Sequence, residues 1–443
     1  MLLHHALSLA SAAAPGVVAA LRDRVGPMVP ASRAAKGESA RTAASASAID
    51  LRVSSDLDGL EETWRAFEKE ADGTVFQTFD WLSTWQRHIG NLGGTVPAVV
   101  TGRDASGALL FLLPLAVERR AFARRLTWLG ADLCDYNGPL LSQRFTERFG
   151  ATWFPALWQE ILGLLRSDPR LRFDYVDLPK MLDTVGSQPN PFVSLEVHSN
   201  PSGAYVATLG TDWEAFYAAN RSGPTRKKER KQLKQLAEHG EVRFVEVDDR
   251  GAIAGSMATL IEQKSHAFAR MGVVDNFARP GYRAFYLDLT SDPRARDIVH
   301  VSRLDVGETV AAASLGLRFR GTYYLVLSSY QDGELARFGP GRAHLNELLR
   351  HAVAGRFRRF DFTIGDEPYK RDWSDIVLRP YDHLQPVTIR GAAVVSAKVA
   401  FRVTKRFIKQ TPALWRLFSK ARALKAALLG RAKQPEAPAG EAE

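Results

Sequence analysis

A four-residue motif occurs twice in this chain, each time at the same point in a repeated order of predicted elements. Arg172-Phe173-Asp174-Tyr175 and Arg359-Phe360-Asp361-Phe362 each directly follow a long amphipathic helix, and each helix follows a run of short strands. The order of elements carries more weight than the letters, because so short a match can arise by chance. We therefore predict a tandem duplication of one α+β unit.

The elements of the two units are predicted from hydrophobic period and turn residues. In the first unit we expect strands at 49–54, 96–101, 108–117, 127–130 and 173–178, and helices at 57–70, 79–89 and 146–165. In the second unit we expect strands at 241–247, 298–305, 309–319, 323–330 and from 359 onward, and helices at 253–270, 282–289 and 342–354.

Length and composition limit the domain organisation. With 443 residues, of which 45% are hydrophobic and 24% charged, the chain is typical of a globular protein with two or three domains. The predicted parts are a disordered Ala-rich leader (1–48), two α+β domains (49–204 and 205–390), and basic amphipathic helices with a disordered tail (391–443). A signal peptide is the alternative for the leader, but His4 and His5 stand where Lys or Arg are usual.

One loop has the composition of an anion-binding site. Residues 337–342 read Arg-Phe-Gly-Pro-Gly-Arg and lie between a predicted strand and a predicted helix. A glycine-rich turn before a helix directs unpaired N–H groups and the positive end of the helix dipole at one point, which suits a pyrophosphate or carboxylate. A plain strand–helix turn is the alternative. The loop matches neither the Rossmann fingerprint nor a P-loop, since His344 occupies the last glycine position and no Gly-Lys-Ser/Thr follows.

From about residue 49 to 390 the sequence resembles the CelD/BcsL-like acetyltransferases, a bacterial branch of the GNAT superfamily that is related to the FemAB-type aminoacyl transferases. The segments that carry the resemblance are Phe76-Gln77-Thr78-Phe79-Asp80-Trp81-Leu82, Leu129-Gly130 with Asp135-Tyr136, Arg226-Lys227-Lys228-Glu229-Arg230, Phe338-Gly339-Pro340-Gly341-Arg342, and 360–370. The resemblance implies tandem GNAT-like acyltransferase folds, the second of which holds acetyl-CoA or another acyl-CoA through Arg337, Gly339, Gly341 and Arg342.

The activity implied by the resemblance is acyl transfer by direct attack of an amine or hydroxyl on the thioester. The implied acceptor is a sugar, a polysaccharide precursor or a lipid-linked glycan, as in exopolysaccharide or cellulose biosynthesis. Two alternatives stay open. One is a FemAB-like transferase that uses aminoacyl-tRNA, and the other is a non-catalytic, membrane-associated scaffold of exopolysaccharide assembly.

This chemistry needs a base, a donor to the carbonyl oxygen and an acid for the leaving thiolate. Asp366 and Glu367 follow the strand after the cofactor helix and are candidates for the base or for orienting the substrate. Tyr330, at the end of the strand before the loop, is the candidate acid. Tyr369 and Lys370 are candidates for binding an anionic substrate, with a surface lysine as the alternative for Lys370.

The first unit has no glycine–arginine loop at the equivalent place, so we expect it to bind no CoA. Its Asp135 and Tyr136 are predicted to face the cleft between the units and help select the acceptor, with a turn-forming Asp as the alternative. We also expect no catalytic metal, because the ten histidines include no His-Glu-x-x-His pair and no carboxylate stands at ligand spacing from His344 and His351. The single cysteine, Cys134, excludes a disulfide framework.

Most of the excess positive charge lies at the C-terminus. Residues 391–443 hold eleven Lys+Arg and three Glu, a net of +8 out of the chain's formal +10. This basic amphipathic pattern predicts either weak contact between 391–433 and an anionic membrane or helices packed on the body. We expect a cytoplasmic protein, peripheral at the inner face of the membrane. A second basic run, 226–234, is suited to CoA phosphates, an anionic substrate or RNA, or is a solvated helix face.

Overall fold

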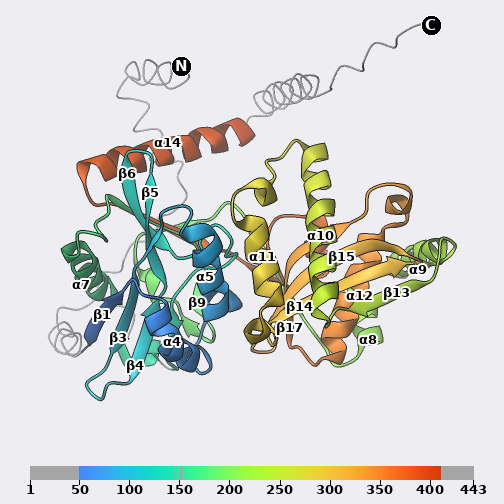
Figure 1. Ribbon diagram of the computed structural model, residues 1–443, viewed down its shortest axis with the longest axis horizontal. Helices are drawn as coiled ribbons and strands as arrows, with labels where there is room; N and C mark the ends of the chain where they lie inside the picture. The colour runs from blue at the N-terminus through green and yellow to red at the C-terminus, as the bar shows by residue number, and fades with distance from the viewer. Residues whose placement is uncertain (1–48, 144, 150–152, 411–443) are drawn as a thin grey trace, which may run out of the picture. The chain divides into compact units, whose positions relative to one another are not determined.

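The computed structural model describes residues 49–143, 145–149 and 153–410. The predicted leader, 1–48, and the predicted tail after Gln410 lie outside these residues. The described residues belong to one compact unit, which begins at Ala48. We call the part that contains β1 to β11 the first half, and the part that contains β12 to β18 the second half (Figure 1).

The first half contains two sheets. Their strand orders are β1-β3-β4-β7 and β11-β19-β8-β6-β5-β2, and a short hairpin, β9 (Thr184–Val185) and β10 (Gln188–Pro189), stands apart. The strands are β1 (Asp50–Ser54), β2 (Val96–Pro97), β3 (Val99–Arg103), β4 (Leu109–Leu113), β5 (Leu115–Arg120), β6 (Ala123–Trp128), β7 (Leu140–Leu141), β8 (Tyr175–Met181), β11 (Val197–Ser199) and β19 (Tyr381–Pro386). The helices are α4 (Glu61–Glu68), α5 (Phe79–Trp85), α6 (Phe145–Phe149) and α7 (Phe154–Ser167).

The second half is built on one seven-stranded sheet of order β13-β14-β15-β16-β17-β12-β18. The strands are β12 (Ala204–Thr208), β13 (Val242–Glu246), β14 (Val299–Val306), β15 (Thr309–Phe319), β16 (Thr322–Tyr330), β17 (Arg359–Ile364) and β18 (Ile376–Leu378). The helices are α8 (Trp213–Asn220), α9 (Gly223–Ala237), α10 (Arg250–Met271), α11 (Tyr282–Ser291), α12 (Pro340–Ala354) and α13 (Pro368–Arg371).

Alternation along β16 divides the core of the second half between the two faces of this sheet. Tyr323 and Leu325 pack with the apolar stripe of α12, whereas Tyr324 belongs to the cluster that contains Leu260 of α10. Successive side chains of a strand point to opposite faces. Helices α10 and α12 therefore cover opposite faces, as Figure 1 shows.

The predicted duplication is present in the topology. In the first half, β6 is followed by α7 and then by β8, which pairs parallel with β6. In the second half, β16 is followed by α12 and then by β17, which pairs parallel with β16. All other ladders between the strands of these two sheets are antiparallel. The α+β class and the tandem fold are thus confirmed.

Several predicted elements differ from the observed ones for local reasons. The predicted strands 96–101 and 108–117 each divide in two, at Ala98 and Pro114, and each passes from one sheet of the first half to the other. Proline has no N–H to continue a ladder, which explains the second break. The helix predicted at 146–165 is observed as α6 and α7. Helix α12 begins at Pro340 rather than at residue 342.

The predicted second domain, 205–390, wrongly includes β19, which belongs to a sheet of the first half. β19 pairs with β8 and β11, so the segment after β18 returns to the first half and completes its sheet. The two halves also share a hydrophobic cluster, in which the rings of Trp81 and Phe285 meet edge to face with centroids 5.0 Å apart. A shared core and an exchanged strand make the halves interdependent.

We predict that a chain ending at Arg379 loses cooperative unfolding, because β8 then exposes an unpaired edge. A chain ending at Gln410 keeps β19 and should unfold as the full chain does. Thermal unfolding of both truncated chains, monitored by circular dichroism, and limited proteolysis test this prediction. Equal stability of the two truncated chains would contradict the role of β19.

The predicted basic extension begins with α14 (Ile389–Gln410). Val394 and Val395 pack against Tyr175 and Leu384, and the Lys398 ammonium is paired with Asp177 of β8. A side chain at Gly391 would collide with the carbonyl oxygen of Asp174, so only glycine permits this approach. The first turns of α14 are therefore packed on the body, as one of the two predicted alternatives requires.

Candidate active site

Strands β16 and β17 pair at one end only. Thr322 to Tyr324 pair with Arg359 to Asp361, and β16 then continues to Tyr330 without a further ladder pair to β17. On its other edge, β17 pairs with β12 through Arg359 to Asp361 and again at Ile364. Among the described strands, the edge of β16 after Tyr324 is thus left with peptide groups that a ligand can bind.

A β-bulge lies where the two strands part. Leu315 of β15 pairs with Leu327, and Gly316 pairs with Leu325, so Val326 of β16 has no partner residue in the register. A bulge takes a peptide group out of the ladder and redirects it. Bulges of this kind are common beside active sites.

The N-terminus of α12 lies beside the end of β16. Gly339 is the N-cap with a φ of +68°, and Pro340 occupies the first helical position. A Cβ on Gly341 would stand 3.1 Å from the ring of Tyr330. Because proline has no N–H and the Arg342 N–H bonds to the Gly339 carbonyl at 3.0 Å, the Gly341 N–H is the free donor of this turn among the described residues.

The two arginines of the predicted loop have different surroundings. Arg342 donates to the side chain of Gln232 on α9 at 2.8 Å. Arg337 is exposed, pairs with Glu334 at 3.3 Å and stacks on Phe338. The structure therefore brings Gly339, Gly341, Arg342 and Tyr330 together, while Arg337 is engaged by a surface carboxylate.

In the first half, the chain itself occupies the corresponding gap. Asn137 forms a parallel bridge with Met181 at the end of β8, and its backbone N–H donates to the Lys180 carbonyl at 3.0 Å. The Lys180 ammonium in turn donates to the carbonyl of Cys134 at 2.6 Å. The edge of β8 beyond β6 is thus closed by residues 134–137, which we call the plug loop.

The plug loop also presents side chains to the second half. The hydroxyl of Tyr136 donates to Asp361 of β17 at 2.8 Å, and both side chains are buried. Asp135 interacts with the Thr363 side chain and with the ammonium groups of Lys180 and Lys370. One loop therefore closes the gap of the first half and contacts the place where β16 and β17 part.

Thr363 holds an unfavourable backbone conformation at this point. Its φ is +61°, a left-handed value that costs a β-branched residue energy. In this conformation its N–H donates to Asp361 at 2.7 Å and its hydroxyl donates to the Leu325 carbonyl at 3.4 Å. The hydroxyl thus spans the two strands where their ladder ends.

Two carboxyl groups of this centre have raised pKa values. Burial raises the pKa of Asp361 to about 7, against the opposing hydrogen bonds from Tyr136 and Thr363. Burial also raises the pKa of Asp135, although Lys180 and Thr363 act in the other direction. Desolvation disfavours the charged form of both groups. A carboxyl with a pKa near neutrality can exchange protons at physiological pH.

We predict that Asp361→Asn changes how stability depends on pH. The folded pKa of Asp361 lies above its unfolded value, so its contribution to stability is full below about pH 4 and is lost as pH rises to about 7, by at most about 1.4 kcal/mol per pH unit. Urea unfolding of both proteins from pH 4 to 8 checks this. Glu68, whose pKa is also raised to about 7, acts equally in both proteins. Parallel curves would contradict the assignment.

The carboxylates predicted from the sequence have ordinary surroundings. Asp366 accepts from the Gly203 N–H at 3.3 Å and from the Tyr205 hydroxyl at 3.4 Å, which ties the turn after β17 to the start of β12. Glu367 is about half exposed and pairs with Lys370 at 3.0 Å. Both carboxylates are exposed, unlike Asp361.

Lys370 is buried, so the alternative of a surface lysine is wrong. Its ammonium donates to the Ile364 carbonyl at 2.9 Å and supports the strained end of β17. Tyr369 packs edge to face on Phe362, and burial raises its pKa to about 12. These two residues adjoin the parted strands, and Lys370 has intramolecular partners.

Sequence reasoning missed Asp361, Thr363 and Lys180. An acidic residue in the middle of an apolar strand was the available signal for Asp361, and it belongs to the repeated motif. Its counterpart Asp174 accepts from the Arg124 N–H at 2.8 Å and the Thr388 hydroxyl at 2.7 Å and anchors the start of α14. The motif therefore did not separate a structural aspartate from a candidate functional one.

Comparison with known protein families identifies the second half. Residues 224–371 match the family model described as an acetyltransferase (GNAT) domain. This part of the chain is therefore similar in sequence to GNAT-type acetyltransferase domains. It contains α9, the parted strands, the N-terminus of α12 and the turn after β17, and the protein is an acyltransferase.

Similarity to solved structures shows that the fold of most of the chain is shared with another protein. The structure titled FemX aligns with a TM-score of 0.53 at 10% identity, covering 73% of this chain and 95% of that one. The C-terminal domain of a putative lysylphosphatidylglycerol synthetase from Agrobacterium fabrum aligns at 0.45 and 10%, covering 78% and 97%. No curated protein sequence matches significantly.

Proposed function

We propose that this GNAT enzyme transfers an acyl group, acetyl in the first instance, from acyl-CoA to an amine or hydroxyl of a sugar, polysaccharide precursor or lipid-linked glycan. The observation that carries the proposal is the parting of β16 and β17 beside the free N–H of Gly341. The donor would bind the second half alone, because the plug loop closes the gap of the first half.

The geometry suits the parts of acyl-CoA. Its pyrophosphate would lie at the N-terminus of α12, where the helix dipole and the Gly341 N–H favour negative charge. Its amide-bearing arm would pair with the free edge of β16, as an added strand does. The thioester would then reach the bulge at Val326, whose displaced peptide group is our candidate donor to the carbonyl oxygen.

We assign the role of base to Asp135, with Asp361 as the second candidate. Both have raised pKa values, and Asp135 is the more accessible of the two. Asp366 and Glu367 remain candidates for orienting the acceptor. Tyr330, half exposed beside Gly341, remains our candidate acid for the leaving thiolate.

Release of free CoA tests the proposed reaction. Incubation of the full chain with acetyl-CoA and a panel of amino sugars and neutral sugars should release thiol only with the correct acceptor. Mass spectrometry of the product distinguishes N- from O-transfer. Hydrolysis at the same rate with every compound would argue against a specific acceptor.

One observation favours an aminoacyl-tRNA donor as the second candidate. Helix α9 is strongly basic, contacts the 3₁₀ helix 334–338, and meets α12 through the Arg342–Gln232 bond. Its cations are Arg226, Lys227, Lys228, Arg230, Lys231 and Lys234. RNA binding through such a face falls steeply with salt. Salt-sensitive binding of aminoacyl-tRNA, without acetyl-CoA binding, would favour this candidate.

The proposed location is the cytoplasmic face of a membrane, with reversible contact through the basic C-terminal residues. No described helix is long and apolar enough to cross a bilayer. Arg119, Arg124 and Arg390 line a hollow of about 490 Å³ at the start of α14, and Phe401 is 68% exposed. These features add basic surface at the start of α14 and an exposed apolar side chain near its middle.

We predict that the full chain co-sediments with anionic vesicles at low salt more strongly than a chain ending at Gln410. The truncation removes six Lys+Arg, each worth about 1 kcal/mol near an anionic surface. The difference should disappear at high salt, because the Debye length shortens. Equal sedimentation of both chains at low salt would contradict the membrane proposal.

A further inference from the structure

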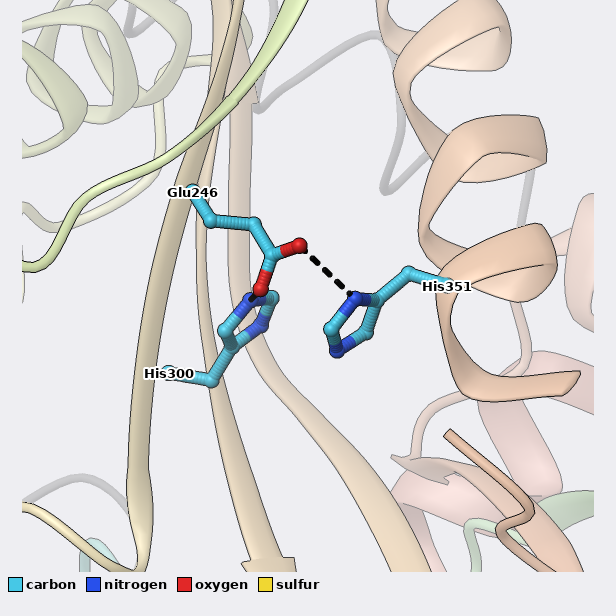
Figure 2. Close-up of side chains that lie close together, drawn as sticks. All are labelled: Glu246, His300 and His351. Carbon is cyan, nitrogen blue, oxygen red and sulfur yellow. Dashed lines mark ion pairs between the residues drawn. The ribbon is translucent and has the colours of Figure 1, made fainter. Parts of the chain in front are cut away.

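We propose that Glu246, His300 and His351 form a binding site for one divalent transition-metal ion, with Zn²⁺ as the reference ion. The three residues come from three elements, β13, β14 and α12 (Figure 2). Their ligand atoms all lie within 4.8 Å of one another. This site is separate from the proposed donor site and does not depend on the proposed function.

Strand register places the first two residues together. Glu246 pairs with Ser302, so His300, two residues before Ser302, lies diagonally opposite on the same face of the sheet. Helix α12 covers this face. His344 bonds to Ser302 at 3.0 Å, and His351, two turns later on the same side of the helix, reaches Glu246.

The distances around Glu246 fit a shared ion. One carboxylate oxygen lies 3.4 Å from His300 Nε2, and the other lies 3.2 Å from His351 Nδ1. Ligand atoms about 2.1 Å from a tetrahedral Zn²⁺ are separated from one another by roughly 3.4 Å. Two imidazoles and a carboxylate, with solvent in the fourth position, form a common zinc ligand set.

A second observation points to a missing partner. The His300 side chain is 5% exposed, and its Nε2, which faces Glu246, has no hydrogen-bond partner. Its other nitrogen, Nδ1, is 2.8 Å from the buried hydroxyl of Tyr323. A ligating histidine is typically held in this way through its second nitrogen. The His351 Nε2 is also buried without a partner.

Two features oppose ion binding: the stacking of the two imidazole rings and the positive charge of Arg318. The rings of His300 and His351 are stacked with centroids 4.5 Å apart and planes 7° apart, so their lone pairs do not converge. Because His351 is the less buried of the two, its ring is the one expected to turn. Arg318 also brings positive charge near His300, but its guanidinium donates to the carbonyls of Arg296 and Val299.

The position of the site suggests a structural function. His351 lies ten residues after Gly341, about 15 Å along α12, so the ion would not touch the proposed donor. It would join the last turn of α12 to the edge of the sheet, at the end of the helix dipole that favours cations. The ion should therefore stabilise the helix whose first turn is proposed to bind the donor.

Zn²⁺ titration of the chelator-treated full chain tests the site, with the visible absorption of bound Co²⁺ as an independent signal of four-coordinate geometry. We expect one equivalent to bind and to raise the thermal unfolding temperature. Glu246→Gln and His351→Ala, at partly exposed positions, should each weaken this binding by more than about 100-fold, and Tyr323→Phe by about 10-fold. His266→Ala, which removes an exposed histidine of α10, should change nothing.

The thermal unfolding of each metal-free variant shows whether it is folded. Absence of Zn²⁺ binding to the wild type at 100-fold molar excess would overturn the proposal. So would wild-type affinity in both Glu246→Gln and His351→Ala, because the ion would then bind other histidines.

Discussion

Gly341→Asp is expected to lower the affinity for acyl-CoA by about a thousandfold while leaving the fold intact. A carboxylate about 4 Å from a pyrophosphate charge costs on the order of 4 kcal/mol at an effective dielectric constant of 20. The new aspartate would stand in the first turn of α12, where a negative charge stabilises the helix. Calorimetric titration with acetyl-CoA, together with thermal unfolding, separates the loss of binding from unfolding.

Gly341→Asn is the matched control for this variant. Asparagine has the size of aspartate without its charge, and both side chains must displace the ring of Tyr330, which lies 3.1 Å from the position of the new Cβ. We expect the asparagine variant to retain most of the affinity. If both variants lose binding equally, the size of the new side chain and not its charge causes the loss, and no phosphate lies at this turn.

Asp135→Asn is expected to lower kcat by about 10²- to 10⁴-fold with little change in acetyl-CoA affinity. The reason is that Asp135 is a partly buried carboxyl with a raised pKa, held beside Thr363 where β16 and β17 part. The acidic limb of the pH profile of kcat/KM should be absent in the variant. Initial rates of CoA release from pH 5 to 9 provide the measurement.

The matched control for this prediction is the double variant Asp366→Asn, Glu367→Gln. It removes two exposed carboxylates that lie near the same centre, and we expect a less than 10-fold effect on kcat. A larger loss in the double variant than in Asp135→Asn would assign the base to the turn after β17. Full activity in Asp135→Asn would exclude Asp135 as the base.

The fold was predictable to the level of the duplicated unit. The helical period located α12, and apolar runs separated by the turn glycines Gly307 and Gly321 located β14, β15 and β16 closely. The exchange of β19 was not predictable, because tertiary packing rather than a local sequence signal decides which sheet this strand joins. The division between β4 and β5 was predictable, because Pro114 interrupts the apolar run.

The candidate site was predictable only where its residues are adjacent in sequence. Gly339, Gly341 and Arg342 were found because a helix start has a local signature. Asp135 was found as a contact residue, but the groups that act on its pKa include Thr363 and Lys370, which are more than 200 residues away in the sequence. The cluster of Glu246, His300 and His351 was missed for the same reason, because spacing rules detect only ligands on one element.

Calorimetric titration of the full chain with acetyl-CoA tests most directly the claim that the second half alone binds the donor. The plug loop closes the gap between β6 and β8, whereas β16 and β17 stay parted. The account predicts one equivalent of acetyl-CoA per chain, and loss of that binding in Gly341→Asp. Two equivalents, or no binding at millimolar acetyl-CoA, would contradict it.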